Sequence, residues 1–261
     1  MKEKATPAVE LARVNTDTGL IKTVAILTMI IDHVGVIFFP GNMWLRVIGR
    51  IAFPLFAWGI VVGAVYTRNL YNYAMRLFVL AAVCQGAYML ALRHTWLELN
   101  VIATLFFGLV GIMGMRVRKY GSAIWAPALA LMLSAAIQMD YGWKGVLLIQ
   151  LMYLARTSPG GLAALMVSFC LYWGSSSSQV QGLFALPQDA YSQPWPLNGM
   201  LNMLYAFLRL QGLALMALPL MIVKTNSGIK IPKCLSYAAY PGHLAILYLI
   251  SQALGRCATG W

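Results

Sequence analysis

The sequence is poor in charge, and most of the charge it has is of one sign. Of its 261 residues 10% are charged, with 7 acidic residues against 19 Lys and Arg. A soluble chain is about a quarter charged, so this composition excludes an ordinary soluble domain. With 61% apolar residues and a mean hydropathy of +0.73, the chain is predicted to be a polytopic membrane protein.

Cysteine is also scarce, and its spacing argues against two kinds of site. Cys84, Cys170, Cys234 and Cys257 form no CxxC pair and have no histidine at metal-ligand spacing. We therefore expect no zinc site, no other bound metal and no disulfide framework. The sequence also lacks a Gly-rich phosphate loop, a nucleophile elbow and an HExxH motif, so it does not favour a kinase, a hydrolase or a metalloprotease.

What the sequence does contain is a series of long apolar runs separated by clusters of charge. These runs predict an all-α membrane bundle of about nine transmembrane helices. We expect one domain over residues 21–256, preceded by a cytoplasmic segment, residues 1–20. The expected spans cover residues 21–39, 45–66, 74–92, 98–115, 123–138, 143–156, 160–174, 199–223 and 235–254.

The basic residues gather in alternate connections between the runs. A cytoplasmic N-terminus puts most Lys and Arg on the cytoplasmic side, as the positive-inside rule requires. Topology and contact with anionic membrane lipids then explain the formal charge of +12. Nucleic acid is not expected as a partner, because the cations form no continuous stripe. The segment 175–198 carries no Lys or Arg and suits an external loop.

Asp32 and His33 stand side by side within the first apolar run. Each charge at such a depth costs about 2.5–3.5 kcal/mol on insertion scales, so an ionisable pair there indicates a functional site. His33 is the candidate general base or transient acyl acceptor, because a neutral imidazole can take a proton from an amine or a hydroxyl. Asp32 would orient His33 or compensate charge. The alternative is a structural hydrogen-bonded pair between helices.

Two arginines and a lysine accompany this pair. Arg46 and Arg50 lie four residues apart on one face of the second run, where Asp32 is their natural counter-ion. Lys22 lies eleven residues before His33, and eleven residues of an α-helix make three turns plus about 20°. The two side chains therefore lie on one helix face, about 16 Å apart along the helix axis. A structural ion pair for the arginines and a membrane anchor for Lys22 are the alternatives.

Four more polar residues are candidates, each with a plainer alternative. Asn100 shares a helix face with Thr104, which also suits hydrogen bonding between helices. Asp140 lies in an external turn, and the alternative is that it only stabilises this turn. His243 follows a Pro-Gly pair that opens the last span locally, although it also suits a core position. Arg209 lies midway along the eighth run and must face protein or water.

These residues fall in motifs that resemble the TraX family of conjugative-pilus proteins. The most specific block is Ile21-Lys-Thr-Val-Ala-Ile-Leu-Thr-Met-Ile-Ile-Asp-His33, followed by Leu45-Arg-Val-Ile-Gly-Arg-Ile-Ala-Phe-Pro-Leu-Phe56. Together the matches cover most of the chain in order. The further blocks are Asn100-Val-Ile-Ala-Thr-Leu-Phe-Phe-Gly108, Asp140-Tyr-Gly-Trp-Lys-Gly-Val-Leu-Leu148 and Tyr240-Pro-Gly-His-Leu244.

The resemblance implies an acetyltransferase of the bacterial inner membrane that modifies the N-terminus of a pilin, with acetyl-CoA as acyl donor. It implies a catalytic set in which His33 handles the amine proton or the acetyl group, and Arg50 or Asn100 stabilises the oxyanion. The implied catalytic residues are Asp32, His33, Arg50 and Asn100. The implied substrate contacts are Arg46, Asp140 and His243, and from its position in the eighth run we expect Arg209 to contact the substrate as well. The CoA phosphates would meet Lys22, Arg68, Arg76 and Arg116.

Three other functions stay open at this point. TraX-like proteins are similar in plan to membrane acyltransferases of envelope glycans, which have Arg where this chain has Lys22, so a sugar hydroxyl is an alternative acceptor. A non-catalytic pilus-assembly protein would need only a groove for an apolar helix. A secondary transporter would also use intramembrane Asp, His and Arg, but the paired repeats common in that class are missing here. The pattern favours no particular oligomeric state.

Overall fold

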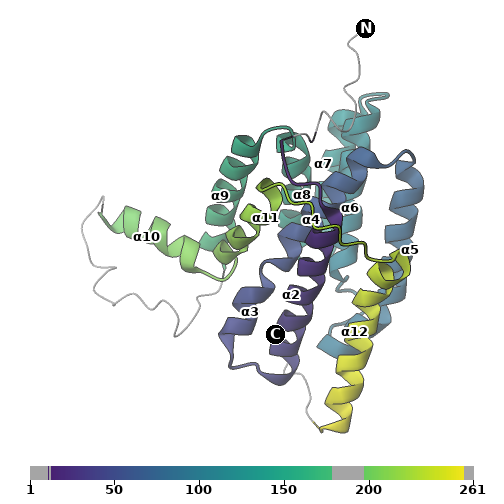
Figure 1. Cartoon of the computed structure of the whole chain (residues 1–261), viewed down its shortest axis with the longest axis vertical. Coiled ribbons are helices and arrows are strands. Elements are labelled where there is room, and N and C mark those ends of the chain that lie inside the picture. The colour runs from purple at the N-terminus through teal and green to yellow at the C-terminus, as the bar shows by residue number, and fades with distance from the viewer. Residues whose placement is uncertain (1–10, 12, 178–196, 256–261) are drawn as a thin grey trace.

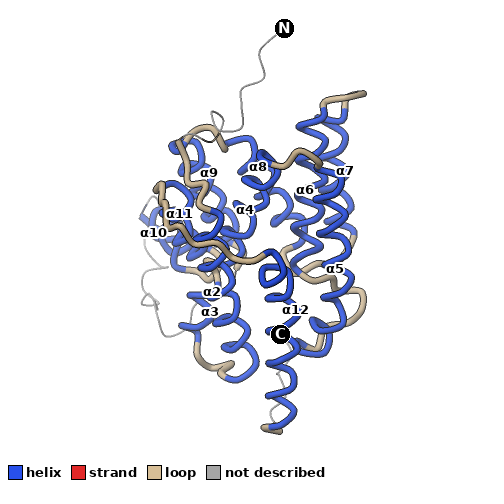
Figure 2. Tube along the Cα trace, turned by 45° about the vertical axis from the view of Figure 1, so that its right-hand side comes forward, coloured by secondary structure: helices blue, strands red, loops and turns tan. Residues whose placement is uncertain are grey.

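The chain is a bundle of helices joined by loops. The computed structural model describes residues 11, 13–177 and 197–255, and within them it has no β-strand (Figure 2). Most of the expected N-terminal segment 1–20, most of the expected loop 175–198 and residue 256 lie outside the described residues. The helices are α2 (Thr18–Phe38), α3 (Met43–Gly49), α4 (Ala52–Tyr66), α5 (Leu70–Leu92), α6 (Val101–Val117), α7 (Ser122–Ala136), α8 (Gly142–Ala155), α9 (Pro159–Ser175), α10 (Leu197–Leu208), η2 (Gly212–Ala217), α11 (Leu218–Ile222) and α12 (Lys233–Ala253).

Each of the nine expected spans falls on a helix or on consecutive helices, but two of them are broken. The run 45–66 divides into α3 and α4 at residues 50–51, and the run 199–223 is bent by 62° between α10 and the helical turns of η2 and α11. Among the described residues, three helical segments are long and apolar enough to cross a membrane: Thr18–Phe38, Met43–Tyr66, which counts α3 and α4 as one span, and Leu70–Leu92. The number rises to four if the bent pair is also one span. Helices α6, α7 and α8 are apolar but shorter. Nine full spans and a cytoplasmic N-terminus remain predictions.

Short polar side chains fix where several helices begin. Asp17 accepts a hydrogen bond from the backbone N–H of the third residue of α2, at 3.1 Å. Asn42, Asn69, Asn100 and Ser158 cap α3, α5, α6 and α9 in the same way. Each cap satisfies an N–H group that has no partner inside its helix, which stabilises the helix start by about 0.5–2 kcal/mol.

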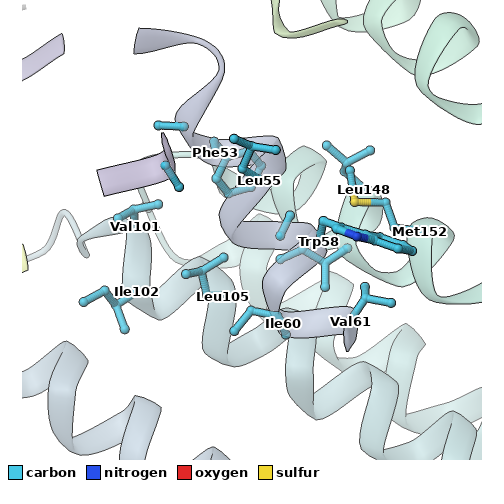
Figure 3. Packing of buried hydrophobic residues seen from close by; sticks show 14 of the residues in the cluster. Phe53, Leu55, Trp58, Ile60, Val61, Val101, Ile102, Leu105, Leu148 and Met152 are labelled. Carbon is cyan, nitrogen blue, oxygen red and sulfur yellow. The ribbon is translucent and has the colours of Figure 1, made fainter. Parts of the chain in front are cut away.

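Helix α4 forms the centre of the bundle, and α5 and α7 lie at its surface. Most of α4 is buried, and its fully buried Trp58 lies in the part of the core that α8 completes with Leu148 and Met152 (Figure 3). By contrast, α5 and α7 expose large apolar side chains such as Val83 and Met132. Such outward apolar faces are expected where helices meet lipid instead of water.

The start of α2 is tied to the segment that follows α11. Asn15 donates to the carbonyl of Leu220 at 2.8 Å and to the hydroxyl of Thr225 at 3.0 Å. The backbone N–H of Ser227 donates to Asp17 at 2.8 Å. Burial acts to raise the pKa of Asp17, but hydrogen bonds from Ser227, Leu20 and Thr225 outweigh it and hold that pKa below its ordinary value. The two segments therefore lie at the same end of the bundle, where the sequence had placed both on the cytoplasmic side.

Two consecutive helices, α2 and α3, and one that is distant in sequence, α12, meet around the candidate residues. Helix α3 packs on α2 after a short hairpin, and α12 lies beside α5 and also contacts α2 (Figure 1). Helix α10 projects from the opposite side of the bundle (Figure 1). The packing of α12 against α2 brings a late part of the sequence to the face of α2 that carries Asp32 and His33.

Candidate active site

A cavity of about 400 Å³ lies where α2, α3, α4, α5 and α12 meet. Its wall combines apolar and aromatic side chains with an unusual number of polar ones. The loops that join α5 to α6 and α7 to α8 contribute to it, so the cavity belongs to the end of the bundle at which these loops lie. The polar and tyrosine side chains along it are Asp32, His33, Arg50, Tyr88, His94, Glu98, Gln138, Asp140, Tyr141, Gln211 and Tyr240.

One wall of the cavity carries a buried charge cluster. Nη2 of Arg50 contacts both carboxylate oxygens of Asp32, at 3.0 and 3.2 Å, and Nε of Arg46 lies 3.4 Å from the first of them. The cluster needs close approach of α3 to α2, because a Cβ at Gly49 would overlap the Asp32 side chain. The structure thus brings together the three charges that the sequence expected at similar depth.

Two histidines from opposite ends of the chain form a hydrogen-bonded pair. Nδ1 of His33 and Nε2 of His243 are 2.8 Å apart, and Nδ1 of His243 lies 2.7 Å from the carbonyl oxygen of Ala239. A carbonyl only accepts, so Nδ1 of His243 donates. In the neutral ring Nε2 then accepts from Nδ1–H of His33, which leaves Nε2 of His33 with a lone pair. His33 lines the cavity, and its contact with His243 favours the tautomer whose Nε2 can accept a proton.

The aromatic part of the cavity is built from stacked rings. Phe53 stacks on Tyr141 with ring centroids 3.8 Å apart and an interplanar angle of 7°. Trp173 of α9 meets both rings edge-on. Tyr240 of α12 meets the rings of His33 and His243 edge-on, at 6.4 and 5.6 Å. These contacts place packed aromatic rings beside the histidine pair.

The two loops at the cavity supply two acidic groups in addition to Asp32 of α2. Glu98 accepts from the backbone N–H of Thr95 and pairs with His94 at 2.8 Å, and both contacts hold the pKa of Glu98 below its ordinary value. Asp140 is exposed to the cavity, but the surrounding protein displaces bulk water and raises its pKa from 3.8 to about 6. Asp32 acts in the same direction, while Arg50 opposes the shift.

Asn100 occupies a structural position. Its side-chain oxygen caps α6 through the N–H of Ile102 at 3.0 Å. Its side-chain nitrogen donates to the carbonyl of Ala81 and to the side-chain oxygen of Gln85, both at 2.8 Å. Asn100 is not among the residues along the cavity. Its amide thus joins α5 to α6, and we leave it out of the chemistry that the sequence suggested for it.

The six Arg and Lys side chains expected at the substrate or the acyl donor are not among the residues along the cavity, and one of them, Arg46, binds Asp32. Arg209 follows α10, donates to the carbonyl of Ser175 and lies 5.4 Å from the ring of Tyr205. Arg116 donates to the carbonyls of Ala64 and Thr67 at the end of α4. Lys22, Arg68 and Arg76 are exposed near the helix ends remote from the cavity. Along α6, the fifteen residues from Val101 at the cavity to Arg116 span about 22 Å.

Sequence reasoning missed two features of this site. Nothing in the spacing of His33 and His243, which are 210 residues apart, indicates that they pair. The hydroxyl of Tyr240 gave no signal either, because a tyrosine in an apolar run is an ordinary core residue. Within the described part of the chain, no group of three or more His, Cys, Asp or Glu side chains is placed to hold a metal ion.

Comparison with known proteins gives one family and several partial relatives. The model of a family described as TraX protein matches residues 17–251. The chain is 30% identical to Protein TraX of Escherichia coli over 181 residues, which is 64% of this chain and 60% of that protein. It is 28% identical to the probable fimbrial assembly protein FimC, serogroup H1, of Dichelobacter nodosus, over 47% of this chain and 55% of that protein.

A third relative is an uncharacterized protein of Rickettsia prowazekii (strain Madrid E), 32% identical over 89 residues, or 34% of each chain. Each match thus spans no more than 60% of the relative's own length. No solved structure matches the chain.

Proposed function

This chain belongs to the TraX family, and from that premise we propose that it is a membrane acetyltransferase of pilus assembly. It would move an acetyl group from acetyl-CoA to the N-terminal amine of a pilin in the bacterial inner membrane. The apolar helices support a membrane protein, and the fimbrial assembly name of one relative supports a role in building pili. The proposal of acetyl transfer is supported by the arrangement of side chains in the candidate active site.

The observation that carries the proposal is the histidine pair at a buried cavity. His33 has a lone pair on Nε2 because His243 accepts from Nδ1–H of His33. A base held in one tautomer by a second group is the arrangement by which enzymes activate a nucleophile. A protein that only guides a pilin helix would not need it.

The residues of the cavity can carry the transfer without a metal. The acceptor nitrogen bonds to the carbonyl carbon of the thioester as Nε2 of His33 takes its proton. The carbon–sulfur bond then breaks, and the thiolate leaves with the proton that His33 returns. Asp32 would hold Arg50 at the cavity wall, where the guanidinium favours the oxyanion that forms between these two steps.

The cavity fits the acyl end of the donor but not its phosphates. Its volume of about 400 Å³ suits an acetyl group with an acceptor terminus. Arg50, the arginine in its wall, is paired with Asp32, and Lys22, Arg68, Arg76 and Arg116 stand at the other end of the bundle. A role of those four cations at the CoA phosphates stays a proposal. In the predicted orientation the cavity lies toward the external side, which favours an acceptor whose terminus reaches that side.

The test is the intact mass of a co-expressed pilin. Wild-type protein should add one acetyl mass, and His33→Ala should add none at equal membrane levels. Thr28→Ala is the matched control, because Thr28 is buried one turn earlier on α2, is not among the residues along the cavity and bonds only backbone carbonyls. If the pilin is not acetylated by the wild type, the evidence shifts to an envelope glycan as acceptor or to a non-catalytic role. If His33→Ala acetylates at the wild-type rate, the assignment of the base is wrong.

A further inference from the structure

The hydroxyl of Tyr240 is buried without a hydrogen-bond partner. Two buried side-chain atoms of the described residues are in this state, the oxygen of Tyr240 and Nε of Arg209. Tyr240 is 6% exposed and lines the cavity, whereas Arg209 does not. A buried polar group without a partner destabilises the fold, so such a group beside a cavity indicates that its partner is a ligand.

The ring of Tyr240 is held by the same two residues that form the base. It meets His33 at an interplanar angle of 72° and His243 at 71°. Tyr240 and His243 are three residues apart on α12 and therefore share a helix face. The same ring contacts hold both imidazoles and the phenol of Tyr240. The position of the Tyr240 ring relative to the His33 ring is therefore fixed.

Arg50 shares this cavity, and two of its three guanidinium nitrogens already have partners. Nη2 of Arg50 binds Asp32, and its Nε lies 3.4 Å from the carbonyl oxygen of Arg46. The chemistry proposed for the cavity creates one new negative charge, on the carbonyl oxygen of the acyl group. A neutral O–H that stands unpaired before the reaction can donate to that oxygen without first breaking another bond.

We infer that the Tyr240 hydroxyl is an oxyanion donor of this site and that its ligand is the carbonyl oxygen of an acyl thioester. As the acceptor nitrogen bonds to the acyl carbon, the π electrons of the carbonyl move onto its oxygen. The hydroxyl donates a hydrogen bond to this oxygen and keeps its proton. When the carbon–sulfur bond breaks, the carbonyl re-forms and the hydroxyl is again unpaired. This role rests on the proposed acyl transfer.

The test compares Tyr240→Phe with wild type, using the full chain purified in detergent with acetyl-CoA and the purified pilin. We expect kcat to fall by about 10²–10³, as for the loss of one oxyanion donor, with the KM for acetyl-CoA unchanged. Because the variant removes an unpaired buried hydroxyl, its thermal unfolding midpoint should stay the same or rise. Tyr153→Phe is the control, since Tyr153 is also buried, stands at the far end of α8 and is not among the residues along the cavity, so kcat should not change.

Each other outcome has one meaning. An unchanged kcat in Tyr240→Phe overturns the role of the hydroxyl while the proposed function stands. A fall in kcat together with a fall in the unfolding midpoint overturns it too, because the residue is then structural. If the wild type transfers no acetyl group, the proposed function fails, and the role of Tyr240 fails with it.

Discussion

Replacing His243 should slow acetyl transfer without removing the base. In His243→Ala, Nδ1–H of His33 loses its acceptor, and nothing then favours the tautomer that presents Nε2 as the proton acceptor. A buried donor left unpaired costs about 1–3 kcal/mol. If that energy is lost in the transition state, the rate falls about 5- to 150-fold. Loss of the base itself in His33→Ala should be larger, about 10²–10⁴-fold.

The assay is single-turnover acetylation of the pilin at matched amounts of protein. His243→Gln keeps an oxygen that can accept from Nδ1–H, so it should recover part of the lost rate. The double variant His33→Ala with His243→Ala should be no slower than His33→Ala alone, because the two residues act as one unit. A wild-type rate in His243→Ala, or additive losses in the double variant, would refute the idea that His243 works through His33.

Three further variants test the frame around the site. In Asn100→Ala the cap of α6 and its tie to α5 are lost, so thermal unfolding should show a loss of about 1–3 kcal/mol, with an unchanged rate for each folded molecule; a large loss of rate at full stability would return Asn100 to catalysis. Gly49→Ala should destabilise the protein by about 1–3 kcal/mol because its Cβ would overlap Asp32, whereas Gly59→Ala, with open space around it, should not. Because the pKa of Asp140 is raised to about 6, the folded state keeps a proton between pH 3.8 and 6 that the unfolded state releases. Stability should therefore fall as pH rises through that window, and Asp140→Asn should flatten the slope in unfolding measured across it; an unchanged slope would contradict the shift.

The helices could be predicted from the sequence, because apolar runs of span length and the clusters of charge between them are local signals. The nine expected segments all lie on helices. The breaks could not be placed in this way. The sequence around Arg50 is a continuous helical pattern, and α3 ends there in the structure so that Arg50 meets Asp32 across the hairpin. The ion pairs of Arg46 and Arg50 with Asp32 lie at this break, and hydropathy does not report them.

The site was predictable where its residues are close in sequence. Asp32, Arg46 and Arg50 are joined by one short hairpin, so a shared depth in the bundle was enough to pair them. His33 and His243 could be named as candidates but not joined, because their contact depends on how α12 packs against α2 and α5. The role of Asn100 could not be predicted either. An amide at the start of a helix looks the same in sequence whether it caps the helix, as Asn100 does, or faces a substrate.

The contact between His33 and His243 also sets an order of events during synthesis. The first described helix carries His33, and the last described helix carries His243, with 210 residues between them. Until α12 has been inserted and packed against α2, a growing chain holds His33 without its partner and lacks one wall of the cavity. If the proposed function holds, a chain that lacks α12 should therefore transfer acetyl groups more slowly than a chain that contains it.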